Sequence, residues 1–184
     1  MNDKQELRKA VHAAIRELSD CDQRDEKIVH TVLSLPAWQQ AHTVALTLSL
    51  ELEITTHPLI DAALEAGKSV FVPKVTRQGL TFHRIRSFDD LEPGVMGILE
   101  PTTPQTNERI DICIVPGRVF NRSGYRIGWG GGYYDRFLAT FTGTTISLAY
   151  DVQLLTDLPV EPHDIPVQLI VTEREMIQCS QSSS

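Results

Sequence analysis

The sequence is poor in cysteine, and its few cysteines are not arranged as a disulfide framework or a metal site. Only three occur among 184 residues, at Cys21, Cys113 and Cys179, widely scattered and odd in number. A disulfide scaffold or a cysteine-based zinc site needs closely spaced pairs, and the six histidines show no metal-ligand spacing either. We therefore expect a reducing, cytoplasmic location and no structural zinc.

Long apolar runs and an excess of basic residues are also missing. No segment approaches the roughly 20 apolar residues of a membrane-spanning helix, and the polar start at residues 1–6 is unlike a signal peptide. The 24 acidic and 17 basic residues give a formal net charge of −7, which argues against a general nucleic-acid-binding protein. We expect small-molecule ligands, no nucleic-acid or membrane partner, and a monomer or weak dimer.

What the sequence does contain is an alternation of helix-like and strand-like segments. Apolar residues repeat at helical spacing over residues 7–18, 23–35 and 59–64. Short apolar runs predict strands over residues 44–50, 69–73, 80–85, 110–115, 144–150 and 169–172. This order favours an α/β fold: a single three-layer domain over residues 1–177, with a mostly parallel open sheet and helices on both faces. We expect a long loop at residues 86–107 and a disordered tail at residues 178–184.

The densest feature of the chain is a glycine loop, defined here as residues 124–132, which holds five of the eleven glycines. A strand-like run precedes it and a helix-compatible run begins at Tyr133; strand, glycine loop and helix can build an anion site from backbone N–H groups. A P-loop would need Lys and Ser or Thr after the last glycine, and a dinucleotide fingerprint starting at Gly128 would need Gly or Ala at Tyr133. The loop is neither. Arg126 at the front edge of the loop and Asp135 just behind it predict a phosphate clamp with a candidate metal ligand.

Polar segments at residues 51–56, 73–74 and 116–135 each follow a predicted strand. In open α/β sheets ligands gather beyond the carboxyl ends of strands, so these segments are expected to converge on one cleft. Other interpretations stay open: Lys4 and Arg8, one helical turn apart, would be solvated side chains on a surface helix, and Asp135 a carboxylate favoured by a helix N-terminus. Glu53 would then be merely an exposed acid.

Residues 115–136, around the glycine loop, closely resemble the signature of the 5-formyltetrahydrofolate cyclo-ligase family, also called methenyltetrahydrofolate synthetases. Residues 4–8 resemble the family's Lys-x-x-Leu-Arg, residues 53–56 its Glu-[Val/Ile]-x-Thr, and residues 97–101 its Gly-Ile-x-Glu-Pro. The resemblance covers nearly the whole chain. The glycine signature is highly specific, whereas the other three segments would be weak alone.

The resemblance implies a ligase that uses ATP and Mg²⁺ to convert 5-formyltetrahydrofolate to 5,10-methenyltetrahydrofolate, releasing ADP and phosphate. The formyl oxygen attacks the γ-phosphorus to give an imidate phosphate, N10 closes onto the activated carbon, and phosphate leaves. Such chemistry asks the protein mainly for positioning and charge neutralisation. A nucleophilic triad is therefore not required.

The resemblance also implies a set of site residues, with Arg126 and Asp135 as catalytic residues and Asp135 as the Mg²⁺ ligand. ATP contacts are implied for Lys4, Arg8, Arg126, Ile127, Gly128, Trp129, Gly130, Gly131, Gly132, Tyr133 and Tyr134. Folate contacts are implied for Leu48, Glu53, Trp129, Gly130, Gly131, Gly132 and Tyr133. Lys74 is a further candidate for the folate glutamate or the phosphates.

The chain departs from the family pattern at three positions. Asn121 stands where many relatives have aspartate, Trp129 where they have tyrosine or phenylalanine, and Gln168 where they often have an acid that helps hold Mg²⁺ in some members. Two alternative functions remain: another enzyme of phosphorylated ligands on a related α/β scaffold, such as a sugar-phosphate isomerase or coenzyme A transferase, and a non-catalytic folate- or nucleotide-binding protein.

Overall fold

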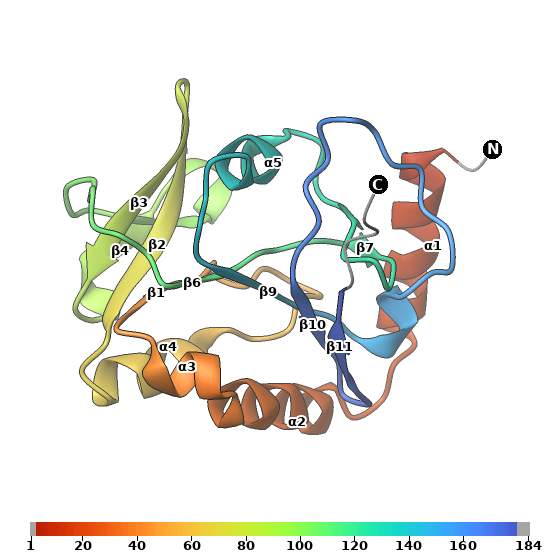
Figure 1. Cartoon of the computed structure of the whole chain (residues 1–184), viewed down its shortest axis with the longest axis horizontal. Coiled ribbons are helices and arrows are strands. Elements are labelled where there is room, and N and C mark those ends of the chain that lie inside the picture. The colour runs from red at the N-terminus through yellow and green to blue at the C-terminus, as the bar shows by residue number, and fades with distance from the viewer. Residues whose placement is uncertain (1–2, 180–184) are drawn as a thin grey trace.

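A seven-stranded mixed sheet forms the centre of the computed structural model, which describes residues 3–179 (Figure 1). The strand order is β11-β10-β9-β6-β1-β2-β3. The strands are β1 (Thr43–Ala45), β2 (Ser69–Thr76), β3 (Gly79–Ile85), β6 (Ile112–Ile114), β9 (Thr144–Leu148), β10 (Leu169–Val171) and β11 (Met176–Gln178).

The five inner strands β2, β1, β6, β9 and β10 run parallel, and the two edge strands β3 and β11 pair antiparallel with their neighbours. The predicted mostly parallel sheet is confirmed, and each of the six expected strands has a counterpart. Strand β11 was not predicted. Its last residue, Gln178, falls in the segment expected to be a tail, and residues 180–184 of that segment lie outside the described residues.

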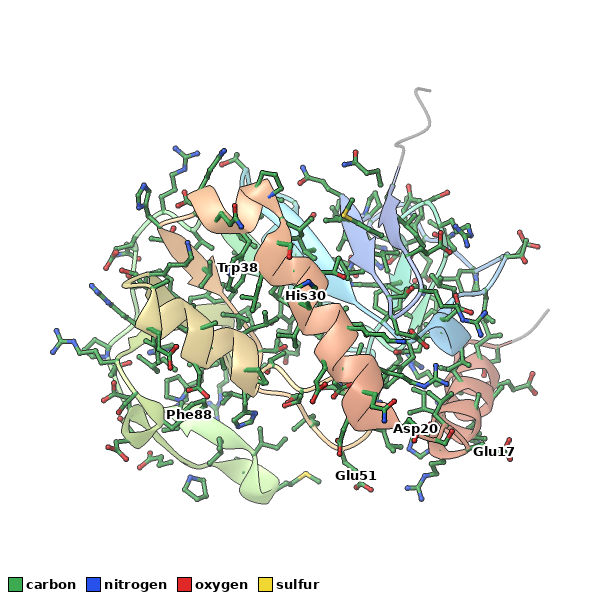
Figure 2. The ribbon with its side chains drawn as sticks, turned by 90° about the horizontal axis from the view of Figure 1, so that it is seen from below. Glu17, Asp20, His30, Trp38, Glu51 and Phe88 are labelled. Atoms are coloured by element: carbon green, nitrogen blue, oxygen red, sulfur yellow. The ribbon has the colours of Figure 1, made fainter. Side chains whose placement is uncertain are left out.

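Helices cover both faces of the sheet, as predicted (Figure 1). They are α1 (Lys4–Arg16), α2 (Cys21–Ser34), α3 (Pro36–Gln40), α4 (His57–Glu65) and α5 (Tyr133–Leu138). Helices α2, α3 and α4 lie across one face, where Figure 2 shows α2 with His30 and α3 with Trp38 in front of the sheet, and α5 lies on the other. None of the helices in the described part of the chain is long and apolar enough to cross a membrane.

Strand alternation divides the core between these two faces. On β2, Val70 and Val72 pack into the cluster that includes the α2 and α4 side chains, whereas Phe71 packs into the cluster that includes Leu138 of α5. All three are fully buried. The sheet therefore holds α5, and the glycine loop that leads into it, on the face opposite α2 and α4.

Helix α1 lies at one end of the sheet and packs against β7 (Val119–Phe120) and a 3₁₀ turn at Asp151–Gln153 (Figure 1). Leu7, Val11 and Ile15 form its buried stripe at four-residue spacing. This packing brings the first turns of α1 next to the glycine loop, although the two segments are more than 100 residues apart in the sequence.

Two sequence-based expectations for loops were wrong. Residues 86–107 hold a two-stranded sheet of β4 (Leu91–Pro93) and β5 (Leu99–Pro101), with 3₁₀ turns at Phe88–Asp90 and Val95–Gly97. Prolines and glycines marked the breaks, but pairing between segments this short depends on the tertiary fold rather than on local sequence. Within residues 116–135, β7 pairs with β8 (Arg126–Ile127) in a second small hairpin, and β8 belongs to the glycine loop.

Lys74 was expected to follow a strand and point into the cleft, which is also wrong. Strand β2 continues to Thr76 and turns into β3, so Lys74 lies within the hairpin and pairs with Thr81. Its Nζ lies 3.3 Å from Glu100 Oε2, on β5. The hairpin reaches the cleft through its tip instead, with Val75 and Leu80.

Candidate functional site

A cleft of about 350 Å³ opens where the glycine loop meets the first turns of α1. All eleven residues predicted to contact ATP line it, and so does Asp135. Pro116, which also lines it, begins a segment that the sequence predicted at the cleft. The sequence did not single out the remaining lining residues, which are Val75, Leu80, Glu161, His163 and Asp164. The structure therefore brings the predicted ATP residues of two distant segments into one site.

Arg126 is held rigidly at the base of this cleft, with only 5% of its side chain exposed. Its Nε donates to the Pro116 carbonyl at 3.2 Å, its Nη1 to the Ile165 carbonyl at 2.8 Å, and its Nη2 to Asp135 Oδ1 at 3.3 Å. Burial lowers the pKa of Arg126, and the neighbouring Asp135 charge opposes this shift. The guanidinium is thus a fixed positive charge with three of its five N–H groups already committed.

Asp135 lies in the first turn of α5 and joins three segments of the chain. Its Oδ1 accepts hydrogen bonds from Arg126 and, at 3.0 Å, from the backbone N–H of Ile165. Within residues 3–179, Oδ2 accepts no hydrogen bond, and the side chain is 20% exposed at the cleft wall. A carboxylate oxygen in this position suits a hard cation such as Mg²⁺. The residues therefore fit a magnesium ion.

The backbone of the glycine loop adopts conformations that side chains rarely allow. Gly130 has a φ of +110° and Gly132, immediately before α5, has a φ of +65°. At Gly131 a Cβ would lie 2.5 Å from the ring of Tyr133, so no larger residue fits without moving that ring. Bare backbone consequently faces the cleft, as an anion cradle requires.

The two cations of α1 are both engaged with other residues. Arg8 Nε donates to the Gly128 carbonyl at 2.7 Å and so fixes the middle of the glycine loop. Lys4 Nζ lies 2.6 Å from Glu161 Oε2, and this hydrogen bond lowers the pKa of Glu161. Both lysine and glutamate line the cleft. The interpretation of Lys4 and Arg8 as merely solvated side chains is wrong.

An acidic segment, residues 161–164, lines the cleft beside the start of α1 and was missed by the sequence analysis. Glu161, His163 and Asp164 place one ligand atom each within 4.8 Å of one another. Asp164 Oδ2 accepts the N–H of Glu161 at 2.8 Å, so the cluster is held partly by its own backbone. The clustering of charge was visible in the sequence, but its distance of about 150 residues from α1 hid the link to Lys4.

A second hollow, of about 30 Å³, adjoins the cleft at Pro116 and contains Glu53. It lies beyond the carboxyl ends of β1, β6 and β9, with Thr47 and Leu148 in its lining. Glu53 Oε2 accepts the N–H of Leu50 at 2.8 Å, which fixes the turn that carries it. Of the predicted folate residues, those from Trp129 to Tyr133 line the main cleft and Glu53 the adjoining hollow.

Three other side chains bear on the predicted sites. Leu48 packs partly buried against the core and lines neither hollow. Gln168 exchanges two hydrogen bonds with Thr145 at the start of β9 and β10, and it too lines neither hollow. The Tyr134 hydroxyl, at the wall of the cleft, is buried without a hydrogen-bond partner among the described residues, and burial raises its pKa. Because burial disfavours the charged form, this hydroxyl stays neutral.

Comparisons with known proteins agree with the sequence motifs. The family model described as "5-formyltetrahydrofolate cyclo-ligase family" matches residues 1–173. The 5-formyltetrahydrofolate cyclo-ligase of Escherichia coli K12 is 34% identical over 151 residues, covering 77% of this chain and 83% of that protein. A probable 5-formyltetrahydrofolate cyclo-ligase of Caenorhabditis elegans is 27% identical over 194 residues, covering 95% and 94%.

Solved structures agree as well. An NMR structure of 5,10-methenyltetrahydrofolate synthetase from Aquifex aeolicus superposes with a TM-score of 0.85 at 34% identity, covering 98% of this chain and 95% of that one. The Mycoplasma pneumoniae 5,10-methenyltetrahydrofolate synthetase gives a TM-score of 0.75 at 25% identity, covering 94% and 99%. The family motifs are thus matched by the whole fold, and this chain belongs to the 5-formyltetrahydrofolate cyclo-ligase family.

Proposed function

We propose that this protein converts 5-formyltetrahydrofolate to 5,10-methenyltetrahydrofolate at the expense of ATP, with Mg²⁺ bound and with release of ADP and phosphate. The observation that carries the proposal is the cleft itself. The cleft brings together a glycine-rich backbone, the fixed cation Arg126 and the carboxylate of Asp135, whose Oδ2 accepts no hydrogen bond from the described residues. The chain that forms this cleft belongs to the cyclo-ligase family. Phosphoryl transfer needs mainly positioning and charge neutralisation, and these groups supply both.

The ATP phosphates would lie along the glycine loop between Arg126 and the cations of α1. The positive φ angles of Gly130 and Gly132 leave the loop backbone bare, so phosphate oxygens can approach its N–H groups. Lys4 would exchange its bond to Glu161 for a phosphate oxygen, whereas Arg8 would continue to hold the loop through Gly128. Arg126 would act as a fixed charge at the transferring phosphoryl group.

Asp135 Oδ2 would hold Mg²⁺, with Asp164 at the same cleft as a further carboxylate candidate. When bound, the ion neutralises charge on the phosphates. Gln168, at the family position that often carries an acid, does not face the cleft and is not part of this proposal. Asp135 keeps its orientation through the two donors to Oδ1.

The folate would lie between the cleft and the second hollow. Its formyl oxygen attacks the γ-phosphorus, the bond from that phosphorus to the bridging oxygen of ADP breaks, and an imidate phosphate results. N10 then attacks the same carbon, phosphate leaves with the former formyl oxygen, and a proton is released from N10. We propose that Trp129 and Tyr133 stack on the flat rings and that Glu53 accepts pterin N–H groups.

The test is product formation from purified protein, followed by the absorbance of the methenyl product with ATP and Mg²⁺ present. We expect turnover that stops when ATP, Mg²⁺ or 5-formyltetrahydrofolate is omitted. Asp135→Asn should lower kcat by at least about a hundredfold, because it removes the carboxylate proposed to hold the Mg²⁺ that neutralises charge on the phosphates. Turnover of a sugar phosphate or of a coenzyme A thioester instead, or tight binding of folate without phosphate release, would replace the proposal with one of the alternatives.

A further inference from the structure

Arg118, which carries no assigned role in the cleft, stacks on the indole ring of Trp129. The Cζ atom of its guanidinium lies 3.8 Å from the ring centroid. Arg118 is only 7% exposed, whereas Trp129 is 62% exposed and lines the cleft. One face of the indole therefore rests on a buried cation, and the residue still presents a large surface to the site.

The guanidinium of Arg118 has no carboxylate partner in the described part of the chain. None of the ion pairs within residues 3–179 includes it, and its Nη1 is buried without a hydrogen-bond partner. Burying a charge without a partner is costly, and burial accordingly lowers the pKa of Arg118. The charge of Glu53 opposes this shift, and the face of Trp129 is the direct contact that offsets the cost, because a desolvated guanidinium binds strongly to an aromatic ring.

The backbone of Arg118 is fixed from both sides. Its N–H donates to the Ile127 carbonyl at 2.7 Å in the β7–β8 hairpin, and its carbonyl accepts the side-chain amide of the buried Gln153 at 3.0 Å. Trp129, in contrast, sits in a glycine loop between Gly128 and Gly130, and such a segment constrains its side chain little by itself. The stack thus joins a rigid residue to a residue on a permissive loop.

We propose that Arg118 is a positioning residue that holds the Trp129 indole in place as a flat platform for the folate substrate. The inference rests on the proposed function and adds to it a determinant of folate binding outside the glycine signature. Without Arg118, the indole rotates freely about its side-chain bonds. Binding of the folate ring must then fix the indole in one orientation. That ordering raises the cost of binding folate but leaves the phosphate groups of ATP untouched.

Tryptophan fluorescence tests the stack without any substrate. The chain has two tryptophans, and Trp38 is 3% exposed, so acrylamide quenching reports mainly on Trp129. Arg118→Leu should increase quenching and lower the fluorescence anisotropy, whereas Arg118→Lys should give intermediate values. The matched control is Arg122→Leu on the same hairpin, which also loses a positive charge but pairs with Glu175 at the surface; it should leave both readings at wild-type values.

Steady-state kinetics then test the link to folate. We expect Arg118→Leu to raise the KM for 5-formyltetrahydrofolate about tenfold, which a desolvated cation–π contact supports, and to change the KM for ATP and kcat less than twofold. Arg118→Lys should recover part of the loss. In a Trp129→Leu background, Arg118→Leu should have no further effect on the folate KM, because the arginine acts through the ring.

Several results would overturn the inference. One is unchanged quenching and anisotropy in Arg118→Leu; another is a rise in the KM for ATP as large as that for folate; a third is an equal effect of Arg118→Leu with and without Trp129. Thermal unfolding followed by circular dichroism identifies a variant that fails to fold, in which case Arg118→Lys carries the test. A wild-type protein that does not turn over 5-formyltetrahydrofolate would refute the proposed function, whereas the fluorescence result would still decide the stack.

Discussion

Replacing Arg126 by leucine is the perturbation that the geometry of the cleft predicts most sharply. The guanidinium makes three hydrogen bonds, to the carbonyls of Pro116 and Ile165 and to the carboxylate of Asp135. Arg126→Leu removes all three at once and leaves Asp135 without its counter-charge. The same change therefore affects both the stability of the fold and the chemistry of the site.

The magnitude follows from burial. Removing one partner of a buried ion pair costs about 3–5 kcal/mol, because the remaining charge stays desolvated. The Asp135 side chain is 20% exposed and still accepts a hydrogen bond from the backbone N–H of Ile165. Hydration and this hydrogen bond therefore offset part of the cost. We expect a loss of about 3 kcal/mol in the free energy of unfolding, a large share of the roughly 5–15 kcal/mol of a typical domain. Arg126→Lys keeps the positive charge but not the guanidinium geometry that makes three hydrogen bonds, and should lower the free energy of unfolding by about 1–2 kcal/mol.

Urea unfolding followed by circular dichroism measures these differences. Arg122→Leu is again the matched control, since Arg122 is exposed at the surface, and it should leave the midpoint unchanged. The reasoning is refuted if Arg126→Leu unfolds within about 0.5 kcal/mol of the wild type, the scatter of an ordinary surface substitution. It is also refuted if a folded Arg126→Leu protein retains wild-type kcat.

Three further substitutions address other parts of the cleft and core. Glu161→Gln removes the charge that pairs with Lys4 and frees Lys4 for the phosphates, so the KM for ATP should fall about two- to fivefold. An unchanged or higher KM would contradict the idea that Glu161 competes with ATP for Lys4. Glu53→Ala should raise the KM for folate more than that for ATP, whereas Glu51→Ala, an exposed change in the same turn, should alter neither. Burial raises the pKa of Asp25 above 3.8, so the folded state disfavours the charged carboxylate. The wild-type protein therefore loses stability as pH rises above 3.8 and Asp25 ionises. Relative to wild type, Asp25→Asn should therefore become more stable in urea unfolding as pH rises above 3.8, and a difference in stability that does not change with pH would contradict this.

The sequence predicted the sheet and the bare backbone of the glycine loop well, because both depend on local pattern. Short apolar runs separated by helical stripes are typical of parallel α/β sheets, and the glycine density reports backbone conformations such as the φ of +110° at Gly130. The motif resemblance also linked α1 to the loop, which periodicity alone could not do. The positions of Arg8 and Gly128 now give that link a physical basis, a hydrogen bond of 2.7 Å.

The errors arose where tertiary contacts decide the outcome. Strand β2 continues past Pro73 because β3 folds back onto it, so Lys74 bonds with Glu100 instead of facing the cleft. The acidic segment at residues 161–164 was missed because only the fold brings Glu161 to Lys4. Arg118 was missed for the same reason, since its partner Trp129 lies beyond a hairpin whose pairing the sequence did not predict.

The central claim is that ATP is consumed only to activate the folate. A single-turnover experiment with enzyme in excess over ATP, in the presence of Mg²⁺, measures ADP and the methenyl product at the same time points. We predict equal amounts of ADP and 5,10-methenyltetrahydrofolate when 5-formyltetrahydrofolate is present, and no ADP above background when it is absent. ADP release at the same rate without the folate, or methenyl product formed without ADP, would contradict the account.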